Sequence, residues 1–564
     1  MAKPTLKLCM CLCLVLNSIV IIGVLCVALL THQGCSDEDF GKAAVAADSE
    51  MCSKIGRDTL RRGGSAVDGA IATLVCTSII HPQSMGIGGG SIFTIREKDG
   101  KVKIINSRET VPKGFNSKLM TMCPKSFQLM SGNDWIGVPG EIRGYEEAHR
   151  RYGRLPWASL FEPTIKMARE GFPLPPVLAR FLTVLDKDKT LPVRNLFVDR
   201  DGNLLKEGDT LRFEKLADTL EIIAEKGADA FYTGDIARDL ISDIQEAGGK
   251  LSLEDLSLFS VQVLDAWKVP LGDYDMYIPP PPAGGAVLSF ILNTMRGYKP
   301  TPASLEGQQK TLTFQRYVET SKFANALRRF LSDPRFRSSK VRTISFTKYT
   351  LSCARTRAMI QDSQTHDAQY YNVTPSLDSM GTTHVSVLAE DGMAVSITST
   401  INHIFGSRVF SPKTGIILNN ELSDFCGKAS TVVISLCAFL IGEQPPSSMS
   451  PAILYSKSKK HTMVVGGSGG SMIITGMALT IMNHLWMGKS LKDAISAPVV
   501  FVDSKNALNF EPNFDKGVEE NLKALGHVVE QRKMFYNVIN AVSKKDGCIT
   551  AVSDERKLGK AAGY

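Results

Sequence analysis

The chain has 564 residues, of which 43% are hydrophobic and 22% charged, and its formal net charge is +8. This length is enough for one large hydrophobic core or two to three ordinary ones, and the composition is typical of a globular protein. Lysine and arginine are dispersed, without an aromatic-interleaved basic stripe, so we expect no nucleic-acid partner. No cysteine or histidine cluster has the spacing of a zinc site, so we predict no metal and no cofactor.

The N-terminal region contains an uncharged apolar segment at residues 8–30. About 20 apolar residues suffice for a helix to cross a bilayer. Lysines precede the segment and acidic residues follow it, so the positive-inside rule places residues 1–7 in the cytoplasm as a tail. We therefore predict a type II signal anchor in the plasma membrane with the rest of the chain extracellular. A cleaved signal peptide is the alternative.

Either alternative exports the rest of the chain, where disulfides persist. Cys52 lies at the start of one predicted helix and Cys76 on the next apolar run, so we predict that these two cysteines form a disulfide. The sequon Asn372-Val373-Thr374 predicts a glycan at Asn372 on an exposed loop.

The exported region begins with a predicted helix at residues 53–62 and an apolar stretch at 66–80, and two predicted strands follow at residues 91–96 and 101–105. The glycine-rich stretch 84–90 precedes a strand, whereas phosphate-binding loops follow a strand and open a helix. We therefore expect its glycines to permit close backbone packing. Arg108 follows the second strand, where an arginine either clamps a carboxylate or forms an ordinary surface ion pair.

The middle of the chain divides into two regions of different pattern. Residues 135–325 are predicted to be mainly helical, for example at 140–151, 157–171, 213–225 and 286–295. Residues 335–380 are polar, rich in serine and threonine and weakly patterned, so we predict an exposed loop or linker there.

A β-hairpin is predicted next, because two β-branched runs, 382–388 and 394–401, flank an Asp-Gly turn signal. A three-residue loop at 391–393 would pair Thr382 with Asn402 and place Thr400 on the same face. A two-residue loop would instead oppose Thr382 to Ile401 and turn Thr400 away. These threonines are also consistent with ordinary strand residues.

The last region combines strands at 452–455, 463–465 and 538–543 with helices at 472–486, 490–497 and 516–525. Glycines at 466–470 precede the first of these helices. Free backbone N–H groups at a helix N-terminus are suited to bind an anion or an oxyanion. The same glycines are equally consistent with a plain flexible connector.

Together these pieces resemble the γ-glutamyltransferase family of N-terminal-nucleophile hydrolases over nearly the whole chain. The motifs that carry the resemblance occur in order, and they include Cys52–Arg57, Gly64–Asp68, Ser84–Gly90, Arg108–Thr110, Gly381–Val387, Thr398–Asn402, Asn419–Glu421, Pro446–Met449, Gly469–Gly470 and Ala561–Tyr564. Several other stretches, such as Ile80–Met85 and Glu511–Phe514, are similar to the type 5 branch, the γ-glutamyl leukotrienases. The resemblance implies an α/β (α+β) fold in a four-layer αββα sandwich.

The resemblance also implies autocatalytic cleavage between Gly381 and Thr382, giving a heterodimer. Residues 31–381 would be the large subunit of the ectodomain and residues 382–564 the small, catalytic one. Thr382 would gain a free α-amino group, whose reference pKa near 8 suits a base at neutral pH. The neighbouring His384 is then expected to be structural.

By the same resemblance, the substrates are small γ-glutamyl amides (glutathione, its S-conjugates and leukotriene C4), with water, an amino acid or a dipeptide as acceptor. Thr382 would be the nucleophile, oriented by Thr400, with the Gly469 and Gly470 amides as oxyanion donors. The charged ends of the γ-glutamyl group would be bound by two sets of residues: Arg108, Ser447 and Ser448 for the carboxylate, and Asn402, Glu421 and Asp424 for the ammonium. Only the hairpin register with the three-residue loop collects Thr382, Thr400 and Asn402 on one face.

The sequence departs from the family pattern at residues 426–444, which form a polar lid in the family but are short and apolar here, notably at 431–441. This departure suggests one alternative to the active enzyme, a membrane-anchored ectodomain that does not self-cleave and acts as a binding protein. A separate alternative is an acylase of the same fold acting on another amide, which would not need Arg108 together with Glu421 and Asp424.

Overall fold

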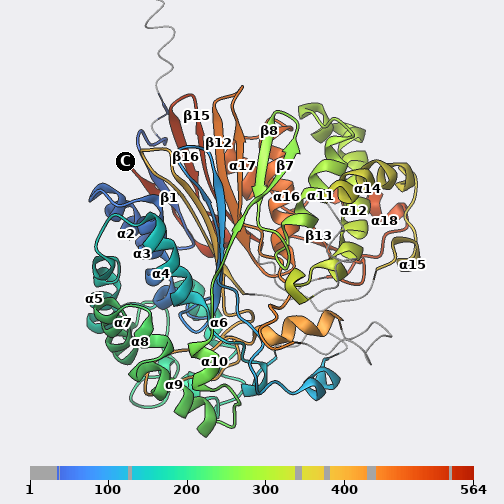
Figure 1. Ribbon diagram of the computed structural model, residues 1–564. Helices are drawn as coiled ribbons and strands as arrows, with labels where there is room; N and C mark the ends of the chain where they lie inside the picture. The colour runs from blue at the N-terminus through green and yellow to red at the C-terminus, as the bar shows by residue number, and fades with distance from the viewer. Residues whose placement is uncertain are drawn as a thin grey trace, which may run out of the picture.

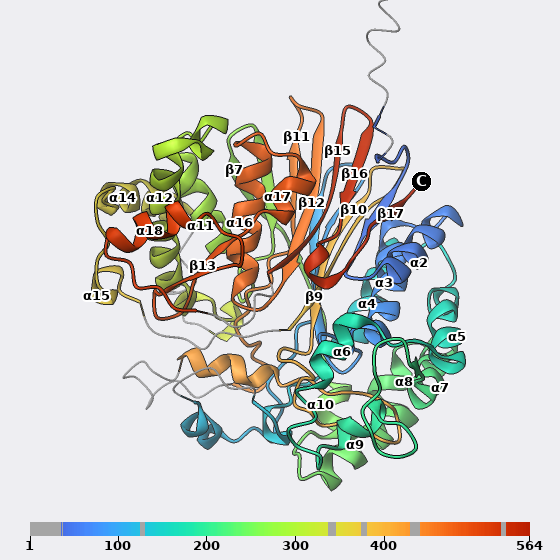
Figure 2. The same cartoon turned by 180° about the vertical axis from the view of Figure 1, so that it is seen from behind.

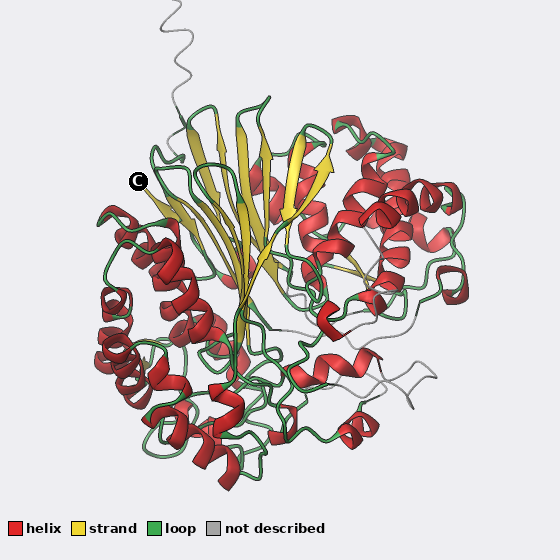
Figure 3. Ribbon diagram, viewed as in Figure 1, coloured by secondary structure: helices red, strands yellow, loops and turns green. Residues whose placement is uncertain are grey.

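The computed structural model describes residues 35–36, 38–124, 130–336, 346–373, 381–428, 440–531 and 537–564. Two β-sheets pack face to face at its centre, and helices cover the outer face of each sheet (Figures 1 and 3). This is the predicted four-layer helix–sheet–sheet–helix arrangement. Figure 2 shows the same layers from behind.

Within the described residues, one sheet has seven strands in the order β17-β1-β9-β10-β2-β3-β6, and the other has six in the order β16-β15-β12-β11-β8-β7. All pairs of neighbours in both sheets are antiparallel. The first sheet consists of β17 (Ala562–Gly563), β1 (Ala44–Ala46), β9 (Thr383–Leu388), β10 (Ala394–Thr400), β2 (Gly90–Arg96), β3 (Val102–Asn106) and β6 (Gln262–Asp265). The second consists of β16 (Cys548–Val552), β15 (Val538–Lys545), β12 (His461–Ser468), β11 (Ala452–Ser456), β8 (Tyr274–Ile278) and β7 (Trp267–Leu271).

Each sheet carries its own helical layer. The first sheet is covered by a layer that includes α2 (Glu50–Arg61), α3 (Ala66–Ile80), α4 (Glu141–Tyr152), α5 (Glu162–Glu170), α6 (Pro176–Leu182), α7 (Glu214–Lys226), α8 (Asp229–Tyr232), α9 (Asp235–Glu246) and α10 (Leu253–Ser257). The second is covered by α11 (Gly285–Arg296), α12 (Gly307–Leu327), α14 (Phe346–Met359), α15 (Ala368–Tyr371), α16 (Met472–Leu485), α17 (Leu491–Ser496) and α18 (Lys516–Ala524). Two short ladders, β4 (Phe172–Pro173) with β5 (Thr210–Leu211) and β13 (Val500–Val502) with β14 (Leu508–Phe510), lie outside the main sheets.

The central helices and strands are buried on all sides, which explains their lack of amphipathic pattern. Every residue of α3 is buried, and so is every residue of β9 and β10. Strands covered on both faces have no solvent-exposed side, so the polar residues of β9 and β10 are buried as well. Between the sheets, the packing includes polar contacts: Ser396 Oγ donates to the Val465 carbonyl at 3.0 Å.

The β9–β10 hairpin has a register that differs from both predicted registers. Leu388 pairs with Ala394 and Thr383 with Ser399, so the loop is 390–392. The cause is Gly392, whose φ of 85° supplies the left-handed residue that ends a three-residue hairpin loop. Position 382 therefore lies opposite position 400, not 401 or 402. A shift of two positions leaves each side chain on its face, so the predicted grouping of Thr382 and Thr400 is retained although the predicted pairing is wrong.

One other sequence prediction needs correction. Residues 335–380 are not simply a loop, because α14 and α15 lie within their described part. The region 135–325 is mainly helical, as predicted, but it also contains β7 and β8, a hairpin at the edge of the second sheet. The alternating burial of β8 is typical of a strand, and this hairpin was not predicted.

The predicted disulfide Cys52–Cys76 is present, and it joins α2 to α3. Two further disulfides, Cys35–Cys548 and Cys123–Cys426, each join residues on opposite sides of Thr382. Among the residues that the structure describes, no helix is both long and apolar enough to cross a membrane. The predicted anchor at 8–30 and most of the apolar segment 431–441 lie outside the described residues.

Candidate active site

The residues predicted for the site come together at one end of the two sheets. Thr382 directly precedes β9, Thr400 ends β10, and Arg108 lies two residues beyond β3. Glu421 and Asp424 lie on a 3-10 helix, η8 (Glu421–Lys428). The Gly469–Gly470 turn joins β12 to α16 and so brings the second sheet to the same place.

Thr382 has a strained backbone held at three points. Its φ is 80°, which is costly for a β-branched residue. Its N–H donates to the carbonyl of Ser84 at 3.1 Å, and its hydroxyl donates to Thr400 Oγ1 at 3.1 Å. Its own carbonyl accepts from Lys557 Nζ at 2.7 Å. Thr382 is buried, so its hydroxyl is shielded from bulk water and has a fixed orientation.

Gly381 places its carbonyl against the predicted oxyanion donor. The Gly469 N–H donates to the Gly381 carbonyl at 3.1 Å. Only glycine fits at position 381, because a Cβ there would lie 1.9 Å from the carbonyl oxygen of Asn402. In this uncleaved chain, the carbonyl of the predicted scissile bond therefore occupies the position that an oxyanion hole would offer to a substrate carbonyl.

The close approaches expected of the glycine-rich stretch 84–90 are also present, and they support the same end of the sheets. A Cβ on Gly89 would lie 2.0 Å from the carbonyl oxygen of Thr400, and one on Gly88 would lie 2.2 Å from that of Ile417. Side chains at these positions would displace the end of β10, which carries Thr400.

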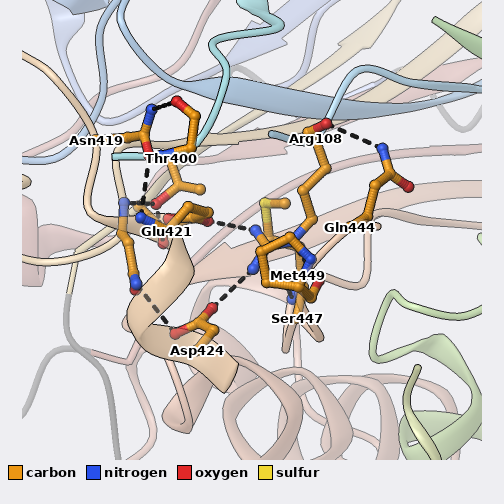
Figure 4. Close-up of polar contacts among 12 residues, drawn as sticks. Arg108, Thr400, Asn419, Glu421, Asp424, Gln444, Ser447 and Met449 are labelled. Atoms are coloured by element: carbon orange, nitrogen blue, oxygen red, sulfur yellow. Dashed lines mark hydrogen bonds and ion pairs between the residues drawn. The ribbon is translucent and has the colours of Figure 1, made fainter. Parts of the chain in front are cut away.

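Arg108 forms the charged centre of the site (Figure 4). Its guanidinium is paired with Glu421 and, at 2.7 Å, with Asp424 Oδ2. It also donates to the carbonyls of Pro445 and Pro446, each at 2.8 Å. Arg108 and Glu421 are each 1% exposed and Asp424 is 20% exposed, so one guanidinium contacts two carboxyl groups in a largely buried cluster.

Asn402 completes this cluster. Its Nδ2 donates to Asp424 Oδ1 at 3.0 Å, and its backbone N–H donates to Thr400 Oγ1 at 2.8 Å. A single residue thus connects the carboxylates to the hydroxyl that contacts Thr382. The predicted set of Arg108, Asn402, Glu421 and Asp424 is brought together.

The two predicted serines lie beside Arg108, but their hydroxyls have other partners. Ser447 Oγ accepts from the N–H of Met449 at 3.1 Å, and Ser448 Oγ accepts from Arg328 at 2.6 Å. Arg328 also donates to the Ser471 carbonyl at 3.0 Å. It lies where α12 ends, and no motif in the sequence pointed to it.

Buried carboxyls shift the electrostatics of the site. Burial raises the pKa of Glu421 to about 8 against the opposing effect of Arg108. Burial also raises the pKa of Glu109 well above its usual range, and neither carboxyl oxygen of Glu109 has a hydrogen-bond partner on another described residue. Glu141, which accepts from Ser399 at 2.9 Å, has its pKa raised to about 7 by burial. Burial therefore raises the pKa of several carboxyls at or beside the site above the usual range of a carboxyl group.

His384 is structural, as expected. It is fully buried, its ring nitrogens contact Thr398 Oγ1 and Ser386 Oγ at 2.9 Å each, and burial lowers its pKa to about 3. Asn372 is exposed and has a left-handed φ of 55°, while the third residue of its sequon lies outside the described residues. Within the described part of the chain, no group of three or more His, Cys, Asp and Glu side chains is placed to hold a metal.

The comparisons with known proteins agree with this geometry. The family model described as "Gamma-glutamyltranspeptidase" matches residues 52–564. The chain belongs to the gamma-glutamyltranspeptidase family. Among its relatives are the glutathione hydrolase 5 proenzymes of Rattus norvegicus and Homo sapiens, each 45% identical to this chain. The rat alignment covers 98% of both chains and the human alignment 96% of both.

Solved structures bear on the fold. A cephalosporin acylase from Bacillus halodurans superposes with a TM-score of 0.81 at 23% identity, covering 93% of this chain and 96% of that chain. A gamma-glutamyltranspeptidase from Helicobacter pylori superposes with a TM-score of 0.52 at 25% identity, covering 57% of this chain and 92% of that chain. The first match shows that the N-terminal-nucleophile hydrolase fold extends over nearly the whole chain.

Proposed function

We propose that this transpeptidase-family chain is an extracellular γ-glutamyl hydrolase and transferase that matures by cleavage between Gly381 and Thr382. Its substrates are glutathione, glutathione S-conjugates and leukotriene C4, which it converts to leukotriene D4. The mature protein is a heterodimer of residues 31–381 and 382–564, anchored in the plasma membrane by residues 8–30. The names of the type 5 relatives support glutathione as a substrate.

One observation carries the proposal: the hydrogen bond from the Gly469 N–H to the Gly381 carbonyl, directly beside the Thr382 hydroxyl. Attack by an internal hydroxyl on this carbonyl would develop negative charge where a donor already points. After cleavage, the departing Gly381 vacates that position for the γ-carbonyl of a substrate.

Turnover then needs only groups of the chain itself. The Thr382 hydroxyl attacks the γ-carbonyl, the freed α-amine accepts its proton, and the leaving amine takes a proton as the C–N bond breaks. A γ-glutamyl ester of Thr382 remains, and water or an amine acceptor then cleaves it. The ammonium of the γ-glutamyl group would pair with Glu421 and Asp424, and its carboxylate with Arg108, replacing the internal ion pairs.

The test is to express the chain from residue 31 in a secretory host and to sequence the N-terminus of each fragment. A fragment beginning at Thr382, together with hydrolysis of a γ-glutamyl anilide and of glutathione, is the expected result. Thr382→Ala should stay uncut and inactive, whereas Thr190→Ala, at an exposed threonine, should behave as the wild type.

Three other outcomes contradict parts of the proposal. A folded chain that is secreted but uncut would favour the non-catalytic binding ectodomain. A cut chain that leaves γ-glutamyl amides intact would favour an acylase for another amide. An enzyme that cleaves glutathione but not leukotriene C4 would limit the substrate range.

A further inference from the structure

A buried ion pair lies directly behind Thr382, and none of the motifs in the sequence pointed to it. Lys557 and Asp48 are both completely shielded from solvent, and Lys557 Nζ contacts Asp48 Oδ2 at 2.6 Å. The same ammonium donates to the Thr382 carbonyl at 2.7 Å and to Ser468 Oγ at 3.0 Å. The Lys557 ammonium thus has three acceptors: a carboxylate, a backbone carbonyl and a hydroxyl.

Asp48 is itself fixed from several directions. Its Oδ1 accepts from Asn540 Nδ2 at 2.7 Å, and its Oδ2 accepts from the hydroxyl of Thr383. Its backbone carbonyl accepts from His81 Nε2 at 3.0 Å. Burial acts to raise the pKa of Asp48, but Lys557, His81 and Thr383 together outweigh it, and the pKa is lowered. Asp48 therefore stays ionised and holds Lys557 in one position.

Thr382 needs such support both before and after cleavage. In the uncleaved chain, a threonine with φ of 80° persists only where its surroundings hold it. Cleavage removes this torsional strain, because Gly381 is no longer bonded to the Thr382 nitrogen, but it also removes the covalent restraint on that side of the residue. The remaining contacts are those to Ser84, Thr400 and Lys557, and the last is a charge-assisted hydrogen bond, roughly twice as strong as a neutral one.

We propose that Lys557, fixed by Asp48, is a positioning residue for Thr382: by holding the Thr382 carbonyl, it fixes the backbone that aims the hydroxyl and the α-amine at the substrate carbonyl. The inference rests on the proposed function, since it concerns the same nucleophile. Lys557 and Asp48 touch neither the substrate nor the reacting atoms, and they act only through Thr382.

The experiment separates positioning from stability by comparing two variants. Lys557→Met keeps the volume but leaves Asp48 as an unpaired buried charge, so it should lower both the melting temperature and kcat. The double variant Asp48→Asn/Lys557→Met removes both charges and relieves that penalty. If Lys557 positions Thr382, the double variant recovers much of the melting temperature but not kcat, because the carbonyl still lacks its donor.

We expect kcat for a γ-glutamyl anilide to fall about 10- to 100-fold in both variants, the rate equivalent of one charge-assisted hydrogen bond. KM should stay within about threefold, because the groups that bind the γ-glutamyl charges are untouched. The matched control is Lys560→Met, at an exposed lysine three residues away whose ion pair with Glu50 spans 3.6 Å. It should leave kcat, KM and the melting temperature unchanged.

The proposal is overturned if the double variant recovers kcat together with its melting temperature, or if Lys557→Met turns over substrate at the wild-type rate. Should neither variant be secreted, Lys557→Arg decides. It keeps the ion pair but replaces the point charge by a planar fork, so a purely structural role predicts wild-type turnover and positioning predicts a loss.

Self-cleavage at Gly381–Thr382, followed on a reducing gel, should slow in parallel. Because this readout needs no γ-glutamyl substrate, it tests Lys557 even if the proposed substrate class is wrong.

Discussion

The disulfide Cys123–Cys426 offers a direct test of how the binding site is held. Cys426 lies on η8, two residues beyond Asp424, and Cys123 follows a 3-10 helix in the first part of the chain. The bond thus ties the element that carries Glu421 and Asp424 to a segment on the other side of the cleavage point. We predict that it sets the position of these carboxylates in the mature enzyme.

The perturbation is the double variant Cys123→Ser/Cys426→Ser, which leaves no unpaired thiol. Removal of a native disulfide typically lowers the free energy of unfolding by about 2–5 kcal/mol. The helix should not be lost, because Leu422 and Phe425 remain packed against Val111 and Trp135. Carboxylates that are held less firmly should bind the substrate ammonium less tightly. The expected loss of binding free energy is that of one charge-assisted hydrogen bond, about 1.5–3 kcal/mol, which corresponds to about a 10- to 100-fold rise in KM.

The assay is steady-state hydrolysis of a γ-glutamyl anilide together with a thermal melt. kcat should change by less than about threefold, since the contacts of Thr382 are unaltered. The matched control is Cys35→Ser/Cys548→Ser, which also removes a bond across the cleavage point but involves no element that carries a site residue. The control should lower the melting temperature without raising KM. An unchanged KM in the first variant, or an equal rise in the control, would refute the reasoning.

Two further predictions follow from the charges of the site. The pKa of Glu141 is raised from 4.5 to about 7, so the folded protein binds the proton of this carboxyl more tightly than the unfolded chain does. The resulting stabilisation of the folded state is fully present below pH 4.5 and is lost as pH rises through about 7. The free energy of unfolding should fall by about 3 kcal/mol in total over this range. Melting temperatures across that range should fall less in Glu141→Gln than in the wild type, and a parallel fall in both would contradict the assignment. Arg108→Lys keeps the charge but cannot serve both carboxylates and the carbonyls of Pro445 and Pro446. It should lower kcat/KM about 10- to 1000-fold while self-cleavage proceeds, and wild-type kcat/KM would show that Arg108 does not bind substrate.

Much of the fold follows from local sequence because its elements are long and buried. The predicted apolar run at 66–80 coincides with α3, and the predicted helix at 472–486 differs from α16 by one residue at its C-terminal end. The edge hairpin of β7 and β8 was missed, although Pro270 in β7 is what an edge strand tolerates. The helix α14 was missed because it is polar and has no clear apolar face. This helix packs against α11, and that tertiary contact is not visible in the local sequence pattern.

The register of the β9–β10 hairpin was predicted wrongly, because it depends on the backbone conformation of the loop. The Asp-Gly signal correctly indicated a hairpin, but a loop of three residues fits this stretch in more than one position. Gly392 is the residue that adopts a positive φ, and this places the loop at 390–392. The resemblance to a known family found Thr382, Thr400 and Asn402 without knowing that pairing, because motif order is independent of register.

The pair Lys557 and Asp48 escaped prediction for a topological reason. Asp48 follows β1 and Lys557 precedes β17, and these two strands are neighbours in the sheet, with β1 next to β9. Both ends of the described chain therefore converge on the strand that begins beside Thr382, although 509 positions separate the two residues.

The same topology explains how the chain could tolerate the proposed cut in its centre. β9 pairs with β10 along its whole length and with β1 of the other proposed fragment over its last residues, and none of these pairings involves Gly381. The proposed break between Gly381 and Thr382 would therefore create a new N-terminus inside the protein without removing a ladder bond. It would remove the covalent restraint on Thr382, and the groups that remain to hold this residue come from both fragments: Ser84 and Asp48 from one, Thr400 and Lys557 from the other. The cut strand would thus be held in place by its partner fragment, which is the condition for a terminal threonine to serve as a fixed nucleophile.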